Sequence, residues 1–342
     1  MRVLQAIQKA AFKVMLAAPS HVKRLAGSPP VIRGQSPEPD LWWAMSIIHR
    51  SQRTDPKPKR LRIEYAFGST ILDAPAPADV QWQDRGIQHR NEGQLSIRVY
   101  TPPTPGPHPG IVFFHGGGYV IGNLESHHSL CAQLSKDTGA VVVAVDYRLA
   151  PEFPFPTPWN DAEDAWRAVT GNPAAFGISG PIAVGGDSAG ANLAIWVGHR
   201  AATAPHVIWA LYPPTDAGQS YPSNIDFGEG LLLTNQRKCW FRDQTYPNSE
   251  DLISPQAQPA KHPCTRADGV VVPEIVAVAG MDVLHDEGEL YIAHLEAQSI
   301  PVTAVRVASQ VHGFASLRRF ASCQRAWEAT IVPLVHALED PS

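Results

Sequence analysis

The stretch that decides the fold runs from residue 182 to residue 190 and reads IAVGGDSAG. Its apolar run is typical of a strand buried on both faces, and a helical pattern begins directly after the glycines. One serine, Ser188, stands between Gly186 and Gly190 in a G-x-S-x-G pattern. A serine on such a strand–turn–helix elbow is exposed at the sheet edge, and its neighbours two residues away have to be small. The pattern alone is equally compatible with a tight turn, so the remaining chain has to supply the partners of a nucleophile.

Strand and helix patterns alternate on both sides of this segment. We predict strands from apolar runs or apolar–polar alternation at 60–65, 95–100, 111–114, 141–145, 182–185, 207–212, 274–280 and 302–308. Helical patterns separate most of them, at 129–139, 160–171, 188–201, 286–298 and 322–338. Repeated strand–helix–strand units predict an α/β fold with a mostly parallel sheet of about eight strands and helices on both faces. The first two strands, with no helix between them, are expected to pair antiparallel at one edge.

Two segments interrupt this alternation, and we predict that they form a helical cap over the sheet. Residues 1–50 give the N-terminal part of the cap and residues 215–262 a cap insertion, while 51–214 and 263–342 form the two parts of the core. Insertions of this length are commonly lids over a ligand site. Within residues 1–18 an amphipathic pattern predicts a helix packed on the protein's own body, with membrane contact as the alternative. The cap side chains expected to line an acyl pocket are Trp42, Trp43, Phe227, Leu231, Leu232, Trp240 and Phe241.

Composition narrows the class of protein. The 342 residues are 44% apolar and 18% charged, with a formal net charge of −4, which gives no electrostatic reason to bind nucleic acid or an acidic membrane. No stretch is long enough to span a bilayer, so stable membrane insertion is not expected. Four cysteines without CxxC spacing indicate reduced thiols in a cytoplasmic protein, although one disulfide remains compatible with them. No zinc spacing or phosphate loop occurs, so neither metal nor cofactor is predicted; a homodimer remains open.

A nucleophilic serine needs a base and an orienting acid, and position along the chain selects both. His312 follows the last predicted strand, at the edge of the sheet where Ser188 emerges. Asp282 is the first acid after the strand at 274–280, whereas Asp286 is interpreted as the N-cap of the next helix. The order Ser188, Asp282, His312 is that of α/β-hydrolases.

A glycine-rich segment, FFHGGGYV at 113–120, supplies a fourth component of the expected active site, besides the nucleophile, the base and the acid. Three successive glycines after a strand allow backbone N–H groups to turn toward one point, because no Cβ blocks the approach. Donors arranged in this way stabilise a tetrahedral oxyanion.

Together these motifs resemble the hormone-sensitive-lipase family of α/β-hydrolases, the bacterial HGGG carboxylesterases. The resemblance runs from about residue 80 to residue 320 and rests on long motifs in the family's order: GQLSIRVYTP (93–102), HGGGYVIGNLESHH (115–128), VDYRLAPEFPFP (145–156), GGDSAG (185–190), DVLHDEG (282–288) and VHGF (311–314). It implies Ser188 as nucleophile, Asp282 as acid and His312 as base. It further implies an oxyanion hole from the amides of Gly117, Gly118 and Ala189, supported by His115, Gly116 and Asp187.

The expected function is therefore that of a serine carboxylesterase acting on small-molecule esters of short to medium acyl chain. Two alternatives use the same residues differently. Plant gibberellin receptors resemble this fold but lack the catalytic histidine, so a non-catalytic ligand-binding member is one alternative. Amide hydrolysis or acyl transfer with the same triad is the other.

Overall fold

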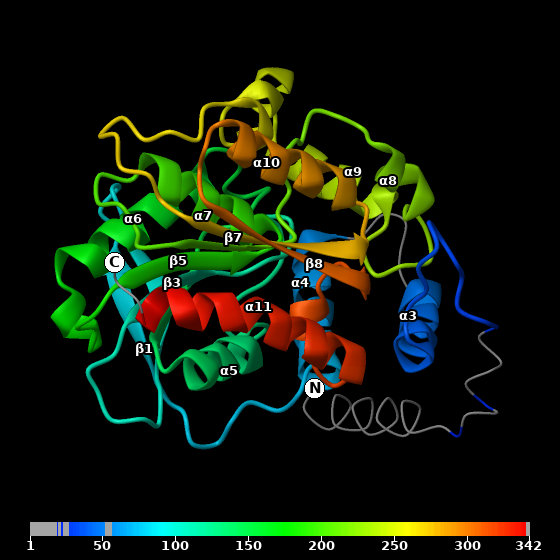
Figure 1. The fold of residues 1–342 in the computed structure, drawn as a ribbon, viewed down its shortest axis with the longest axis horizontal. Coiled ribbons are helices and arrows are strands. Elements are labelled where there is room, and N and C mark those ends of the chain that lie inside the picture. Colours follow the sequence, from blue (N-terminus) through cyan, green and yellow to red (C-terminus); the bar gives the residue numbers. More distant parts are fainter. Residues whose placement is uncertain (1–18, 20–21, 23–26, 52–56, 340–342) are drawn as a thin grey trace.

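The computed structural model describes residues 19, 22, 27–51 and 57–339, and one sheet of eight strands runs through the centre of this part (Figure 1). Its spatial order is β1-β2-β4-β3-β5-β6-β7-β8. All neighbours from β4 to β8 pair in parallel, while β2 is antiparallel to both β1 and β4. The strands are β1 Gln81–Gln88, β2 Gln94–Thr101, β3 Gly110–Phe114, β4 Val141–Asp146, β5 Ile182–Asp187, β6 Ile208–Leu211, β7 Glu274–Met281 and β8 Val302–Val311.

Helices cover both faces of the sheet, as the βαβ pattern predicts. In Figure 1, α5 and α11 lie below the sheet, and α6, α7 and α10 lie above it. Each face has its own apolar core, with Trp209 and Trp327 in one and Trp159 and Trp166 in the other. The helix bounds are α5 His128–Thr138, α6 Thr157–Gly171, α7 Ala189–Arg200, α10 His285–Ala297 and α11 Ala321–Glu339.

The strand prediction at 60–65 is wrong, because these residues lie in helix α4, Pro58–Leu72. Pro58 occupies the first helical turn, where a missing N–H costs nothing. The apolar–polar alternation of RLRIEY concealed a helical period: Leu61, Tyr65 and Leu72 face one cavity, while Ile63 is exposed. The antiparallel edge pair is instead formed by β1 and β2.

The last strand differs from its predicted burial. The apolar run at 302–308 predicted a strand covered on both faces, but β8 is the edge of the sheet and its side chains are mostly half-buried or exposed. The strand that pairs with β8, β7, is buried along its entire length. An apolar run therefore marks a strand here but does not distinguish a central position from an edge.

Four further helices lie around the end of the sheet to which the strand arrows of β7 and β8 point (Figure 1). They are α3 Pro39–Ser51, α4 Pro58–Leu72, α8 Pro222–Asp226 and α9 Asn235–Thr245. Short 3₁₀ turns occur at η2 Pro173–Phe176, η3 Ser249–Ile253, η4 Pro259–Lys261 and η5 Phe314–Ser316. The division into cap (1–50 and 215–262) and core stays a prediction, and the amphipathic pattern of residues 1–18 lies outside the described residues.

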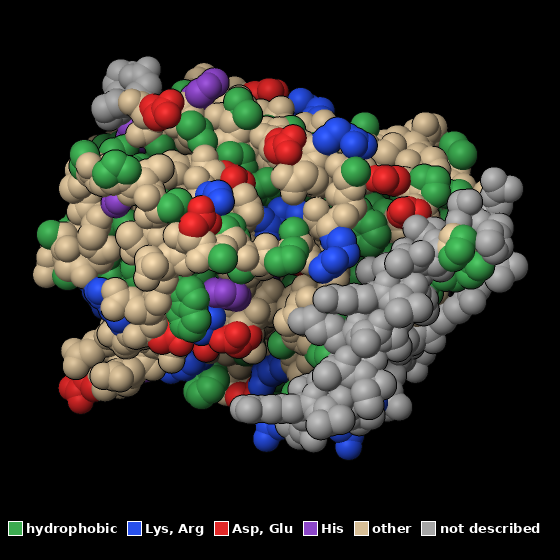
Figure 2. Space-filling view, turned by 90° about the horizontal axis from the view of Figure 1, so that it is seen from below, with side chains coloured by type: hydrophobic (Ala, Val, Ile, Leu, Met, Phe, Trp, Pro, Cys, Tyr) green, Lys and Arg blue, Asp and Glu red, His purple; other side chains and the backbone are tan. Residues whose placement is uncertain are grey.

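The surface seen in Figure 2 shows basic and acidic side chains interspersed among polar and apolar ones over the described residues. Among the helices of the described chain, none combines the length and the apolar character that crossing a bilayer requires. All four cysteines carry free thiols, and three of them, Cys131, Cys264 and Cys323, are buried.

Candidate active site

Ser188 lies at the turn between β5 and α7, in a backbone conformation that residues other than glycine rarely adopt. Its φ is 52° and its ψ is −123°. The turn is so tight that a Cβ on Gly190 would lie 1.9 Å from the carbonyl oxygen of Phe114, and one on Gly186 would lie 2.4 Å from the backbone of Gly190. The atoms that a Cβ would meet belong to the backbone and cannot move aside, so only glycine fits at both positions. The strain raises the serine hydroxyl above the carboxyl end of β5.

The structure brings Ser188 together with the two residues predicted as its partners. His312 Nε2 lies 2.8 Å from Ser188 Oγ, and His312 Nδ1 lies 2.7 Å from Asp282 Oδ2. The Asp282 carboxylate is buried, and its other oxygen accepts the backbone N–H of Leu284 at 2.9 Å. Because the carboxylate accepts from Nδ1–H, Nε2 is left free to accept the serine proton.

Asp286, four residues beyond Asp282, does not have the capping role that the sequence predicted. The N-cap of α10 is Leu284, and Asp286 lies within the first helical turn. Its carboxylate instead pairs with Arg33 at 2.7 Å and accepts the backbone N–H of Ser223 at 2.8 Å. The helix begins earlier than expected because residues 282–285 already form a hydrogen-bonded turn.

The glycine-rich loop after β3 lies beside Ser188 in the same cavity. Gly117 and Gly118 have φ values of 120° and 58°, which glycine adopts without strain. The N–H of Gly116 is used differently: it donates to Asp187 Oδ1 at 2.8 Å and ties the loop to the elbow. Helix α9 backs the loop, because a Cβ on Gly118 would lie 2.3 Å from the ring of Phe241.

Two buried groups behind the loop fix its geometry. Burial lowers the pKa of His115 to about 3, with His127 adding to the shift, so this imidazole is neutral and does not serve as a base at neutral pH. Its Nδ1 donates to the carbonyl of Gly116 at 2.8 Å. Burial alone would raise the pKa of Asp187, but His127, 3.2 Å away, and the Gly116 amide hold it below its usual value. A carboxylate is thereby kept under the loop.

Ser188 and His312 open into a cavity of about 400 Å³. Its walls come from the sheet edge and from α3, α4 and α9, and they include Ile48, Leu61, Tyr65, Leu72, Gly117, Gly118, Ala189, Leu232, Leu233 and Phe241. Of the cap side chains predicted to line an acyl pocket, only Leu232 and Phe241 do so among the described residues. Phe227 and Leu231 are instead buried in the core.

Several lining residues were not predicted from the sequence. Tyr65 was missed because α4 was taken for a strand. Lys238 and Asn224 lie in the segment 215–262, where only apolar side chains were considered. Glu287 is fully buried and lies at the cavity wall, one residue beyond Asp286. No local signal distinguished Lys238, because α9 also carries Arg237, Arg242 and Asp243, and only the packing of α9 against α10 brings the lysine to Glu287.

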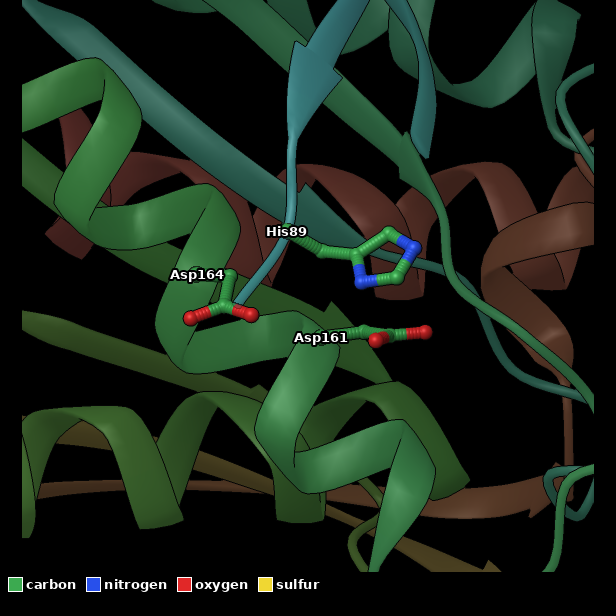
Figure 3. A group of neighbouring side chains, drawn as sticks. All are labelled: His89, Asp161 and Asp164. Carbon is green, nitrogen blue, oxygen red and sulfur yellow. The ribbon is translucent and has the colours of Figure 1, made fainter. Parts of the chain in front are cut away.

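One further cluster has the spacing of a metal site. Figure 3 shows His89, just beyond the end of β1, beside Asp161 and Asp164 on α6. Both carboxylates are already hydrogen-bonded to arginine: Asp161 accepts from Arg148 Nη2 at 2.6 Å, and Asp164 accepts the Arg90 amide at 2.6 Å and its Nε at 3.1 Å. The guanidinium groups supply the positive charge that these acids need. We therefore interpret this cluster as a network that fastens the β1–β2 hairpin to α6.

Comparison with protein families assigns more than half of the chain to a known fold family. Residues 111–316 match a family whose members have the alpha/beta hydrolase fold. The chain is 35% identical over 287 residues to an ethyl acetate hydrolase of Pseudomonas putida, covering 81% of this chain and 88% of that protein. It is 36% identical to the carboxylic ester hydrolase LipN of Mycobacterium tuberculosis, over 66% of this chain and 62% of that protein.

Solved structures give the same assignment. A hyperthermophilic esterase from the archaeon Pyrobaculum calidifontis superposes with a TM-score of 0.75 at 31% identity, covering 87% of this chain and 99% of that one. An ester hydrolase from the metagenome of Lake Arreo gives a TM-score of 0.77 at 31% identity, covering 87% and 97%. With the fold, the ordered motifs and these relatives in agreement, the chain belongs to the hormone-sensitive-lipase family of α/β-hydrolase-fold carboxylesterases.

Proposed function

We propose that this protein is a serine carboxylesterase that works through an acyl-enzyme on Ser188. The observation that carries the proposal is the chain of contacts from Ser188 Oγ to His312 Nε2, and from His312 Nδ1 to Asp282, with Ser188 and His312 lining the cavity. A nucleophile, a base and an orienting acid at hydrogen-bond distance are what nucleophilic acyl transfer requires.

In the first half-reaction, Ser188 Oγ attacks the ester carbonyl carbon while His312 Nε2 takes the hydroxyl proton. The buried Asp282 carboxylate stabilises the resulting imidazolium and keeps the ring oriented. The backbone amides of Gly117, Gly118 and Ala189 hold the oxyanion of the tetrahedral intermediate. His312 then returns the proton to the departing alcohol oxygen as the C–O bond breaks.

In the second half-reaction, water takes the place of the alcohol. His312 removes a proton from the water as its oxygen attacks the acyl carbon, and then protonates Ser188 Oγ as the acid leaves. The neutral state of His115 and its bond to Gly116 favour a supporting role for that histidine, which leaves His312 as the base.

The size of the cavity favours esters of short to medium acyl chain. Each buried CH₂ adds about 0.8 kcal/mol of binding, so kcat/KM rises with chain length until the cavity of about 400 Å³ is full. Beyond that point further carbons remain in water and the gain disappears. We place the maximum at about four to eight carbons. The ethyl acetate hydrolase among the relatives is named for a small ester.

The test is a series of p-nitrophenyl esters from acetate to palmitate, measured below and above the solubility limit of each, with the matching anilides in parallel. The proposal predicts ester turnover with a maximum at short to medium acyl chains and no jump in rate at the solubility limit. Faster hydrolysis of palmitate than of hexanoate, or a sharp increase above the limit, indicates a lipase. Absence of ester turnover leaves the non-catalytic alternative, and faster anilide turnover the amidase.

A further inference from the structure

One wall of the cavity carries a charged pair that the proposed chemistry does not use. Lys238, on α9, and Glu287, on α10, both line the cavity, and Lys238 Nζ lies 2.8 Å from Glu287 Oε2. Asn224 lines the same wall, and its Oδ1 lies 3.4 Å from Lys238 Nζ. This side also includes Gln219 and Ser220. We call Lys238, Glu287 and Asn224 the polar wall.

A second part of the lining is mostly aliphatic, and we call it the apolar wall. It comes from α3, α4 and the segment before α9 and includes Ile48, Leu61, Leu72, Leu232 and Leu233, while α4 also contributes Glu64, Tyr65 and Ser69. Ser188 and His312 open into the space enclosed by both walls. A substrate whose carbonyl reaches Ser188 therefore has one environment that accepts hydrocarbon and another that presents hydrogen-bonding groups.

The polar wall retains hydrogen-bonding capacity for a ligand. An ammonium has three N–H donors, and Lys238 uses one on Glu287, while its contact with Asn224 is longer than an ordinary hydrogen bond. The lysine side chain is 15% exposed and the glutamate 0%. Glu287 Oε1 accepts the backbone N–H of Thr215 at 3.0 Å, and a carboxylate offers about four lone-pair sites. Lys238 thus offers N–H donors to the cavity, while the enclosed carboxylate of Glu287 balances its charge.

The balance of charge selects the kind of group that fits. A charged substrate group at Lys238 also lies near the Glu287 carboxylate, 2.8 Å from the ammonium, so it meets an attractive and a repulsive charge together. A neutral hydroxyl accepts a hydrogen bond from Lys238 without adding a charge. A methyl group in the same place leaves these polar atoms without a partner, which is costly in a site that excludes water.

We propose that the polar wall binds a hydroxyl group of the substrate, so that the preferred esters carry a hydroxyl at the end that points away from the apolar wall. This inference rests on the proposed esterase function and adds a substrate class to it. Lys238 is then a specificity-determining residue that contacts the substrate away from the reacting carbonyl, and Glu287 is the residue that positions it.

A purely structural role predicts something different. Lys238 and Glu287 also join α9 to α10, and Asn224, 3.4 Å from Lys238, donates through Nδ2 to the carbonyl of Val283, the residue after Asp282. If fastening were the whole role, removing the pair would lower the rates for all esters in the same proportion. Binding of a hydroxyl instead changes the ratio between two esters that differ only in that group.

The experiment compares alkyl butanoates ending in a hydroxyl with isosteres ending in a methyl group, and ethyl ω-hydroxyalkanoates with the matching ethyl alkanoates. The first pair tests the alcohol side of the substrate and the second its acyl side. We expect the wild type to prefer the hydroxyl ester in one of the pairs. In Lys238→Met the ratio of the two kcat/KM values should fall roughly ten- to a hundredfold, as for loss of a charged hydrogen bond.

Two further variants keep the test decisive. Lys238→Met leaves a buried carboxylate unpaired and can destabilise the fold, so Lys238→Met/Glu287→Gln removes both charges and should show the same fall. The matched control is Lys261→Met: Lys261 also pairs with a buried acid, Asp216, at 2.8 Å, but neither residue lines the cavity. Its ratio should match that of the wild type.

The outcomes separate the two proposals. Ester turnover without preference for the hydroxyl ester in either pair overturns the inference and leaves the esterase function intact. The same holds for proportional losses on both esters with an unchanged ratio, which identify a structural pair. Failure of the wild type to hydrolyse any of the esters overturns the esterase function itself.

Discussion

The carboxyl edge of the sheet and helix α9 meet at the same cavity but are held in different ways. At the edge, backbone lies against backbone: Gly190 is too close to Phe114 for any side chain, and Ser188 has a positive φ. Helix α9 is held by side chains, with Phe241 against Gly118 and Lys238 on Glu287. Contacts between backbones permit few substitutions, whereas side-chain contacts can be exchanged for others of similar volume. The difference indicates that the chemistry is fixed at the edge and that specificity can change on α9.

The largest expected effect lies at the edge. Ser188→Ala should lower kcat by about 10⁴–10⁶ with the fold intact, because the nucleophile is lost. His312→Ala should cause a similar loss, and the double variant should be scarcely slower than either single one, since the two act as a unit. Ester turnover and thermal unfolding of the three variants check this. A Ser188→Ala protein that keeps more than a few per cent of activity excludes Ser188 as the nucleophile.

The second prediction separates two acids four residues apart. Asp282→Asn should lower kcat by about 10⁴, because the imidazole loses the partner that sets its tautomer. Asp286→Asn keeps a similar shape but loses the charge that pairs with Arg33, so it should cost about 1 kcal/mol of stability and leave kcat within a fewfold. Steady-state kinetics and urea unfolding of both variants are the measurement. The reverse pattern would show that Asp286 is the acid.

The third prediction contrasts two glycines. In Gly190→Ala the new methyl meets backbone that cannot yield, so we expect a loss of stability of several kcal/mol or failure to fold. Gly171→Ala, at the end of α6, meets nothing within 4 Å and should be neutral or stabilising by up to about 1 kcal/mol. Soluble yield and denaturant unfolding compare the two. Equal stability would contradict the view that backbone contact fixes the elbow.

The smallest predicted effect concerns an acid at the same edge but outside the cavity. Burial raises the pKa of Asp146 from 3.8 to about 6, although Arg98 opposes the shift. A carboxyl with a raised pKa in the folded state favours folding only while it is protonated, so the wild type should lose stability as the pH rises from about 4 to about 6. Asp146→Asn lacks this loss and should be more stable by about 2 kcal/mol above pH 6, with little difference near pH 4. Urea unfolding across this range is the measurement, and a difference that does not vary with pH would contradict the assignment.

The sequence predicted those features that depend on backbone pattern. Central parallel strands are buried on both faces, so their apolar runs stand out, and the residues that follow them must meet at one edge. That rule correctly brought Asp282 and His312 to the elbow of Ser188. The glycines at positions 186 and 190 could also be predicted from the sequence, because the turn at the nucleophile permits no larger residue.

The features that were missed depend on tertiary packing. RLRIEY fits both a strand and one face of α4, and only the cavity against which that face packs selects the helix. The roles of Phe227 and Leu231 were mistaken because core and cavity wall require the same apolar residues. The pairing of Lys238 with Glu287 joins positions 49 residues apart, and no local pattern connects them.

The central claim is that Ser188 forms a covalent intermediate, and trapping it is the most direct test. Wild-type protein treated with a p-nitrophenyl alkylphosphonate should lose esterase activity and gain the mass of one phosphonyl group per chain. Peptide mapping should place the adduct on Ser188, and Ser188→Ala should remain unlabelled under the same conditions. An active protein that is labelled on another residue, or that hydrolyses esters while resisting the reagent, would contradict the account.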